Sequence, residues 1–117
     1  MRGPEGAVYH SGDTAFFDGF AEIGQRLGPI DWAMIPIGAY EPRWFMEAQH
    51  MGPEDAVEAA RLLGATNLVA MHWGTFRLTD EPIAEPPIRA RARWIEQGRD
   101  EDRLWILDVG ETRRLVR

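Results

Sequence analysis

Three short apolar segments, each followed at once by a loop with polar side chains, constrain the fold of this chain more than any other feature. They cover residues 7–10, 32–36 and 68–71. A nearly continuous apolar run is typical of a strand that is covered on both faces, as in a parallel sheet. If helices join the segments by right-handed crossovers, the strands are parallel and the loops that follow them meet at one sheet edge. Open α/β sheets bind their ligands at that edge.

Apolar periodicity predicts helices between these strands. The first helix is expected over residues 15–27, where large apolar side chains recur every three or four positions and a Gly-Pro pair ends the pattern. The second is expected to begin at Pro53 and to end at Gly64. Proline suits the first helical position, and the two carboxylates that follow it suit the positive end of a helix. Residues 7–71 are therefore expected to form strand, helix, strand, helix and strand.

The last third of the chain predicts one more helix and a pair of strands. The helix is expected from Pro87 to about residue 97. Its buried face is expected to carry Ile88, Ala92 and Ile95. Residues 104–107 and 114–116 are expected to form two short strands joined as a hairpin. The predicted fold class is therefore α/β, in a single domain over residues 1–117.

Composition limits the chemistry and the partners. The 19 acidic and 13 basic side chains give a net charge of −6, which argues against a nucleic-acid partner held by phosphate neutralisation. Because the sequence has no cysteine, neither a disulfide nor a thiolate metal site is available. Any metal ion must then be held by carboxylates and imidazoles.

Hydropathy bears on the location of the protein. No apolar run reaches the roughly 20 residues of a transmembrane helix, and the first residues do not resemble a signal peptide. A cytoplasmic protein without a transmembrane segment is therefore the expectation. The aromatic side chains of residues 40–46 could make peripheral contact with a membrane, although packing onto the protein is the favoured interpretation.

Five side chains in the loops at the expected sheet edge are candidates for chemistry. Asp13 follows the first strand and suits a metal ligand, a general base or a helix N-cap, of which the cap is the most frequent. His72 ends the third strand and is either a metal ligand or a packed, hydrogen-bonded histidine. His50 precedes the second helix and is either a second-sphere or substrate contact or a surface histidine. Tyr40 and Arg43 could hold an anionic substrate, although a solvated arginine is the commoner case.

Familiar catalytic motifs are absent from the sequence. It has no glycine-rich phosphate loop, no Gly-x-Ser-x-Gly elbow and no His-Glu-x-x-His pair. The leading nucleophile is therefore a metal-bound hydroxide, because a metal ion lowers the pKa of its water to about 7. A catalytic zinc ion takes about three protein ligands and a water, and a two-metal site takes more, so these loops offer only part of a site.

Four ordered motifs make the chain resemble a known family. They cover residues 12–14, 35–46, 49–57 and 72–76, and the likeness continues through the Glu-Pro-Pro triplet at 85–87 to Gly110-Glu111. Together they closely resemble the C-terminal half of metallo-β-lactamase-fold hydrolases of the N-acyl-phosphatidylethanolamine phospholipase D type. The resemblance implies half of an αββα sandwich, in which two sheets pack face to face and helices cover the outside.

The resemblance also implies roles for three residues. Asp13 corresponds to an aspartate that bridges two zinc ions, and His72 to a histidine that completes the coordination of the second ion. His50 corresponds to a histidine that contacts the substrate phosphate or assists the reaction. The implied reaction is hydrolysis of a phosphodiester, in a phospholipid or a small molecule, or of a lactone in other branches. A hydroxide that bridges the zinc ions is the implied nucleophile.

One part of the family pattern is missing from this sequence. Most zinc ligands of the family lie in an earlier His-x-His-x-Asp-His motif, and none of the three histidines here is so spaced. The chain by itself is therefore expected to bind metal weakly and to lack activity. It is a fragment of a longer enzyme, it assembles with a second chain or with itself, or it is a non-catalytic, self-associating interaction module. Half of a sandwich exposes an apolar sheet face, which favours association.

Overall fold

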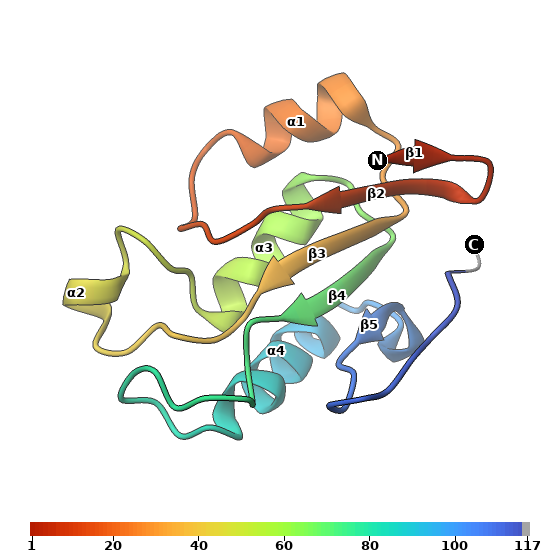
Figure 1. Ribbon diagram of the computed structural model, residues 1–117. Helices are drawn as coiled ribbons and strands as arrows, with labels where there is room; N and C mark the ends of the chain where they lie inside the picture. The colour runs from red at the N-terminus through yellow and green to blue at the C-terminus, as the bar shows by residue number, and fades with distance from the viewer. Residues whose placement is uncertain (116–117) are drawn as a thin grey trace.

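One five-stranded sheet forms the frame of the molecule (Figure 1). The computed structural model describes residues 1–115. The strands, in their order across the sheet, are β1 (Arg2–Gly3), β2 (Gly6–His10), β3 (Trp32–Pro36), β4 (Asn67–Met71) and β5 (Leu104–Trp105). β1 pairs antiparallel with β2, and β2 to β5 are parallel. The expected α/β architecture with three parallel strands is confirmed, and β5 extends it by a fourth.

Helices connect the parallel strands. They are α1 (Phe20–Leu27), α2 (Arg43–Met46), α3 (Pro53–Leu62) and α4 (Glu85–Glu96), with a short 3-10 helix at Glu101–Arg103. Figure 1 shows α1, α3 and α4 on the same side of the sheet. Their buried side chains form one core with the strands, since Phe20, Val57 and Trp94 belong to the same buried cluster as Leu68 and Leu104.

The two faces of the sheet differ in what covers them. Ala33, Leu68 and Leu104 are partners across three adjacent strands and belong to the core beneath the helices. Successive side chains alternate between faces, so the next row, Met34, Val69 and Trp105, faces the opposite side. Within residues 1–115, Figure 1 shows no helix over that side. The sheet is therefore helix-covered on one face only.

The expected first and last helices need correction. α1 begins at Phe20 rather than at residue 15, and α4 begins at Glu85. The buried face of α4 carries Pro86, Ala90 and Trp94. The expected face was wrong, because Ile88 and Ile95 have 68% and 49% of their surface exposed. α4 has two apolar stripes, and the one with the largest side chain is buried; the Trp94 indole also donates to the carbonyl of Asp100 at 2.7 Å.

The expected terminal hairpin was also wrong. β5 pairs parallel with β4, with Leu68 opposite Leu104, and so extends the main sheet. Burial of Leu104 against the helices favours this pairing over a local one. A turn follows, in which the Glu111 amide donates to the Asp108 carbonyl at 2.9 Å. Residues 114–115 are not in a strand, and residue 116 lies outside the described residues.

An ionic network ties α3 and α4 to the loop after β3. Arg89 donates two hydrogen bonds to Glu54, at 2.8 and 2.7 Å, and one to Glu85 at 3.0 Å. Its guanidinium also lies 4.8 Å from the centre of the Tyr40 ring, and the Tyr40 hydroxyl donates to Glu85 at 2.6 Å. Burial tends to raise the pKa of Glu54, but the bonds from Arg89 outweigh it and lower this pKa. The bonds from Tyr40 and then Arg89 lower the pKa of Glu85.

Replacement of Arg89 by methionine is expected to lower the free energy of unfolding by about 2 kcal/mol at pH 7, because Glu54 and Glu85 lose a charged donor. The folded pKa values of both carboxyl groups lie below their ordinary value of 4.5. The network therefore stabilises the fold fully above about pH 5 and stabilises it less as the pH falls through the folded values. Urea unfolding of the unaltered chain and of Arg89→Met should converge at acid pH. Arg91→Met, on the exposed side of the same helix, is the control; an equal loss there would contradict the prediction.

Candidate functional site

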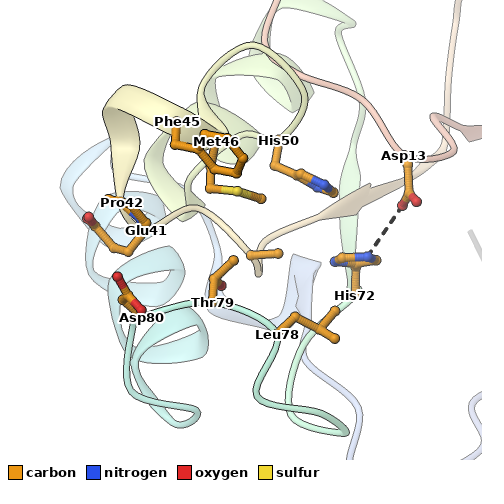
Figure 2. A pocket seen from close by; sticks show the side chains of 11 residues that line it. Asp13, Glu41, Pro42, Phe45, Met46, His50, His72, Leu78, Thr79 and Asp80 are labelled. Atoms are coloured by element: carbon orange, nitrogen blue, oxygen red, sulfur yellow. Dashed lines mark ion pairs between the residues drawn. The ribbon is translucent and has the colours of Figure 1, made fainter.

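Three of the candidate residues meet at the edge where the parallel strands end (Figure 2). Asp13 lies in the loop after β2, His72 follows β4 directly, and His50 lies between α2 and α3. The Nε2 atom of His72 is 3.5 Å from Oδ1 of Asp13. The rings of His50 and His72 are stacked, with centres 5.4 Å apart. The expectation that these loops converge at one sheet edge is confirmed.

The close approach of β3 and β4 fixes the position of His72. The two strands pair up to Pro36 and Met71, and the amide of Ile37 continues the ladder by donating to Met71 at 3.0 Å. A Cβ atom built on Gly38 would lie 2.2 Å from the carbonyl oxygen of His72, so only glycine allows this contact. His72 itself has a φ of 61°, in the left-handed region that non-glycine residues seldom adopt. This turn directs the imidazole away from the strand.

The loop after β2 carries Asp13 into the same region. The amide of Ser11 donates to Met34 on β3 at 3.1 Å, which extends the sheet by one bond. The amide of Gly12 then donates to Nδ1 of His10 at 3.0 Å. Asp13 is no helix cap, because α1 begins seven residues later at Phe20, with Gly19 at its N-cap. Its carboxylate is 68% exposed and is available to a ligand.

A pocket of about 540 Å³ opens beside these three residues (Figure 2). Three apolar side chains, Phe45, Met46 and Leu78, contribute to its lining. The remaining lining residues are Ala39, Glu41, Pro42, Thr79 and Asp80. In Figure 2 the two histidines and Asp13 lie toward one end of the pocket, and Glu41 and Asp80 lie toward the other. The pocket therefore has an end with imidazole and carboxylate groups, which suits a metal ion, and apolar side chains beside that end.

Tyr40 and Arg43 do not line this pocket. The Tyr40 side chain is fully buried, and its pKa is raised by burial and then by its bond to Glu85. Arg43 is held by Asp55, with its Nη2 atom 3.0 Å from Oδ2 of that residue. The structure gives both residues contacts within the protein that fasten the loop after β3, and it does not bring them to the three residues above.

Several residues of the pocket were not among the candidates from the sequence. Met46 and Phe45 lie on α2, a helix of four residues that apolar periodicity cannot detect. Leu78, Thr79 and Asp80 come from a polar stretch after β4 that resembles an ordinary connecting loop. The four family motifs include residues 35–46 and 72–76 but not residues 78–80, so only part of the pocket lining lies within them.

The donor atoms fit part of a metal site. The Nδ1 atoms of His50 and His72 are buried and have no hydrogen-bond partner in the described part of the chain. Imidazole nitrogen and carboxylate oxygen are the ligands that zinc takes when thiolates are absent. Within residues 1–115, however, no three or more such side chains are grouped so that they could hold a metal ion. The residues present therefore fit one side of a metal centre.

Comparison with known proteins places the chain in a family. Residues 1–73, more than half of the chain, match the model of the β-lactamase superfamily domain. The chain belongs to the β-lactamase superfamily. Within it, the relatives and the structural neighbour below make it a metallo-β-lactamase-fold protein similar to N-acyl-phosphatidylethanolamine phospholipases D. The family resemblance noted from the motifs is thus confirmed.

Two kinds of relatives of this superfamily protein carry names that describe an activity. The N-acyl-phosphatidylethanolamine-hydrolyzing phospholipase D 1 of Caenorhabditis elegans is 52% identical over 80 residues, which cover 67% of this chain and 22% of that protein. The corresponding mitochondrial enzyme of Saccharomyces cerevisiae is 33% identical over 90% of this chain and 23% of its own length. A UPF0173 metal-dependent hydrolase of Shouchella clausii is 38% identical over 90% of this chain and 38% of its own length.

A solved structure agrees with this membership. The metallo hydrolase of the hyperthermophilic archaeon Ignicoccus hospitalis superimposes with a TM-score of 0.67 and 28% sequence identity, over 92% of this chain and 40% of that one. The chain thus spans between about a fifth and two fifths of the length of these relatives. Among its described residues, no helix is long and apolar enough to cross a membrane.

Replacement of Gly38 by alanine is expected to displace the β3 and β4 ends, because the new Cβ atom would overlap the backbone of His72. We expect a loss of about 2 kcal/mol in the free energy of unfolding, together with changed NMR signals of the His72 ring. Gly3→Ala is the matched control, since no atom lies within 4 Å of a Cβ built there. If both variants unfold at the same urea concentration as the unaltered chain, the close contact at Gly38 is not a constraint.

Proposed function

We propose that this chain supplies the C-terminal half of the active site of a zinc-dependent hydrolase, with Asp13 and His72 as metal ligands and His50 as a substrate-side group. The observation that carries the proposal is the meeting of Asp13 and His72, 3.5 Å apart, after they follow two different parallel strands. A carboxylate and an imidazole at this separation suit ligands of one centre. The metal-dependent hydrolases among the relatives support the same chemistry.

The remaining ligands of this site belong to a segment outside the 117 residues, on the same chain in a longer protein or on a partner. Two zinc ions need more donors than Asp13 and His72 provide. The family resemblance supplies a candidate, the His-x-His-x-Asp-His motif of its N-terminal half. The sheet face without helices supports the same interpretation, since a second sheet packs there in an αββα sandwich.

The metal ions, when bound, supply an activated water and positive charge for the oxygens of the substrate. The residues of this chain position the other groups. The exposed carboxylate of Asp13 and the imidazole of its neighbour His72 would hold an ion from two sides. His50, stacked on His72, is placed to give a hydrogen bond or a proton to a substrate oxygen. Phe45 and Leu78 exclude water from the wall of the pocket.

A phosphodiester is the substrate class that this arrangement supports best. Two metal ions suit a phosphoryl group, whose oxygens they can clamp. The apolar wall suits an alkyl or acyl portion beside it, as in a phospholipid, and two of the relatives are named for hydrolysing one. Trp44, 85% exposed on α2 next to the lining residue Phe45, is placed to touch a lipid surface. Tyr40 and Arg43 support the pocket wall without touching the substrate.

A second candidate function, a self-associating module without catalysis, is favoured by a different observation. The outer face of α4 carries an apolar groove lined by Pro87, Ile88, Arg91, Ala92 and Ile95. Exposed apolar surface of this kind promotes association. Size measurement of the purified chain separates the two functions, because the module forms a well-packed oligomer without zinc, whereas the hydrolase half depends on zinc or on a second chain.

Replacement of Asp13 by asparagine is expected to weaken zinc binding by about 100-fold, because the charged ligand is lost. The change is read by titrating Zn²⁺ into the labelled chain and following the His72 ring signals by NMR. In a longer parent protein the same variant should lose zinc content and phosphodiester hydrolysis together. Asp18→Asn, an exposed acidic residue of the same loop, is the control. Equal zinc affinity in the unaltered chain and in Asp13→Asn would refute the assignment of this ligand.

A further inference from the structure

Glu81 is a buried carboxylate that the proposed chemistry does not use. Only 8% of its surface is exposed. Its Oε1 atom accepts hydrogen bonds from the amides of Tyr40 and Glu41, both at 2.8 Å, and from the hydroxyl of Thr79 at 2.6 Å. Thr79 also donates to Oε2. One side chain thus binds two segments that lie some 40 residues apart in the sequence.

These two segments are opposite parts of the pocket lining. Ala39, Glu41 and Pro42 contribute one part, and Leu78, Thr79 and Asp80 contribute the other. A further bond, from the amide of Asp80 to the carbonyl of Glu41 at 3.1 Å, runs between them. Glu81 itself does not line the pocket, so its carboxylate joins the two walls from behind.

The partners of Glu81 suit a carboxylate that stays charged. Burial tends to raise the pKa of Glu81, but the bonds from Thr79 and from the amides of Glu41 and Tyr40 outweigh it and lower this pKa. A buried charge without such donors would cost several kcal/mol. No lysine or arginine in the described residues forms an ion pair with Glu81. The bonds therefore depend on the exact placement of two backbone amides and one hydroxyl.

Glu81 is also close to the imidazole end of the pocket. A small cavity of about 20 Å³ adjoins the pocket, with Ala39 and His72 in the lining of both, and Glu81 and Gly38 also line this cavity. Ala39 has a φ of 65°, a left-handed conformation that its neighbours must hold in place. The amide of the next residue, Tyr40, is one of the groups bound by Glu81. Gly38, the preceding residue, is in contact with the backbone of His72.

We propose that Glu81 is a positioning residue of this site, which sets the separation of the two pocket walls and, through the turn at Ala39, the placement of His72. The inference rests on the proposed function only in taking this pocket as the place of reaction. Glu81 touches neither metal nor substrate. It acts through the amides of Tyr40 and Glu41.

The test compares Glu81→Ala with Glu81→Gln in the ¹⁵N-labelled chain of 117 residues. Alanine removes every acceptor, so amide hydrogen exchange at Tyr40 and Glu41 should quicken by about tenfold or more. The ring signals of His72 should shift in the same variant, although no atom of that ring is bonded to Glu81. Glutamine keeps an oxygen that accepts the same two amides, and it should restore slow exchange and the His72 signals.

Glu85→Gln is the matched control, because Glu85 binds the Tyr40 hydroxyl from the other side of the same loop and leaves the backbone bonds intact. It should leave the His72 signals in place. If Glu81→Ala fails to fold, Thr79→Val removes one of the bonds and should produce a smaller shift of the same signals. His72 signals that do not move in Glu81→Ala, or in Thr79→Val where that variant replaces it, would overturn the proposal. Because these measurements need no metal, a failure of Zn²⁺ to bind the unaltered chain would count against the proposed function alone.

Discussion

The contact between the ends of β3 and β4 is the constraint on which the site depends. Gly38 lies against the carbonyl of His72 so closely that a methyl group would not fit. The segments that follow β3 and β4 both leave the sheet at this point. Each does so through a residue with a left-handed backbone, Ala39 after β3 and His72 after β4. The pocket therefore forms where two parallel strands cannot continue side by side. The loop that carries Asp13 is joined to β3 by the hydrogen bond from the Ser11 amide to the Met34 carbonyl.

Much of this fold was predictable from local pattern. The continuous apolar runs at 32–36 and 68–71 specified buried parallel strands, because few other structures bury every residue of a short segment. The start of α3 was predictable from Pro53 and the carboxylates that follow it. The last third was harder, for two physical reasons. α4 has two apolar stripes, and periodicity cannot decide which one packs against the sheet; the partner of β5 is set by burial of Leu104, which no local pattern reports.

The site was predictable to the extent that its residues follow strands. Asp13 and His72 were identified by their places after apolar runs and by the family motifs, and the structure brings them together. Tyr40 and Arg43 also follow an apolar run. Tyr40, however, is buried in the core, and Arg43 is paired with Asp55. Glu81 could not be found in this way, because its partners are mostly backbone amides of a distant segment. A backbone amide has the same chemistry at every residue, so the sequence cannot mark the two that matter.

The parallel arrangement of the strands also affects the order in which the protein can assemble. Each parallel pair joins segments separated by a helix, so none of these pairs can form from a short local stretch. Pairings of this kind form slowly, since a long loop must close before any bond is gained. The edge that holds Asp13 and His72 gains its second wall only once residues 78–80 are in place. During synthesis on a ribosome, a nascent chain that stops short of these residues would present Asp13 and His72 at an edge with one wall of the pocket missing.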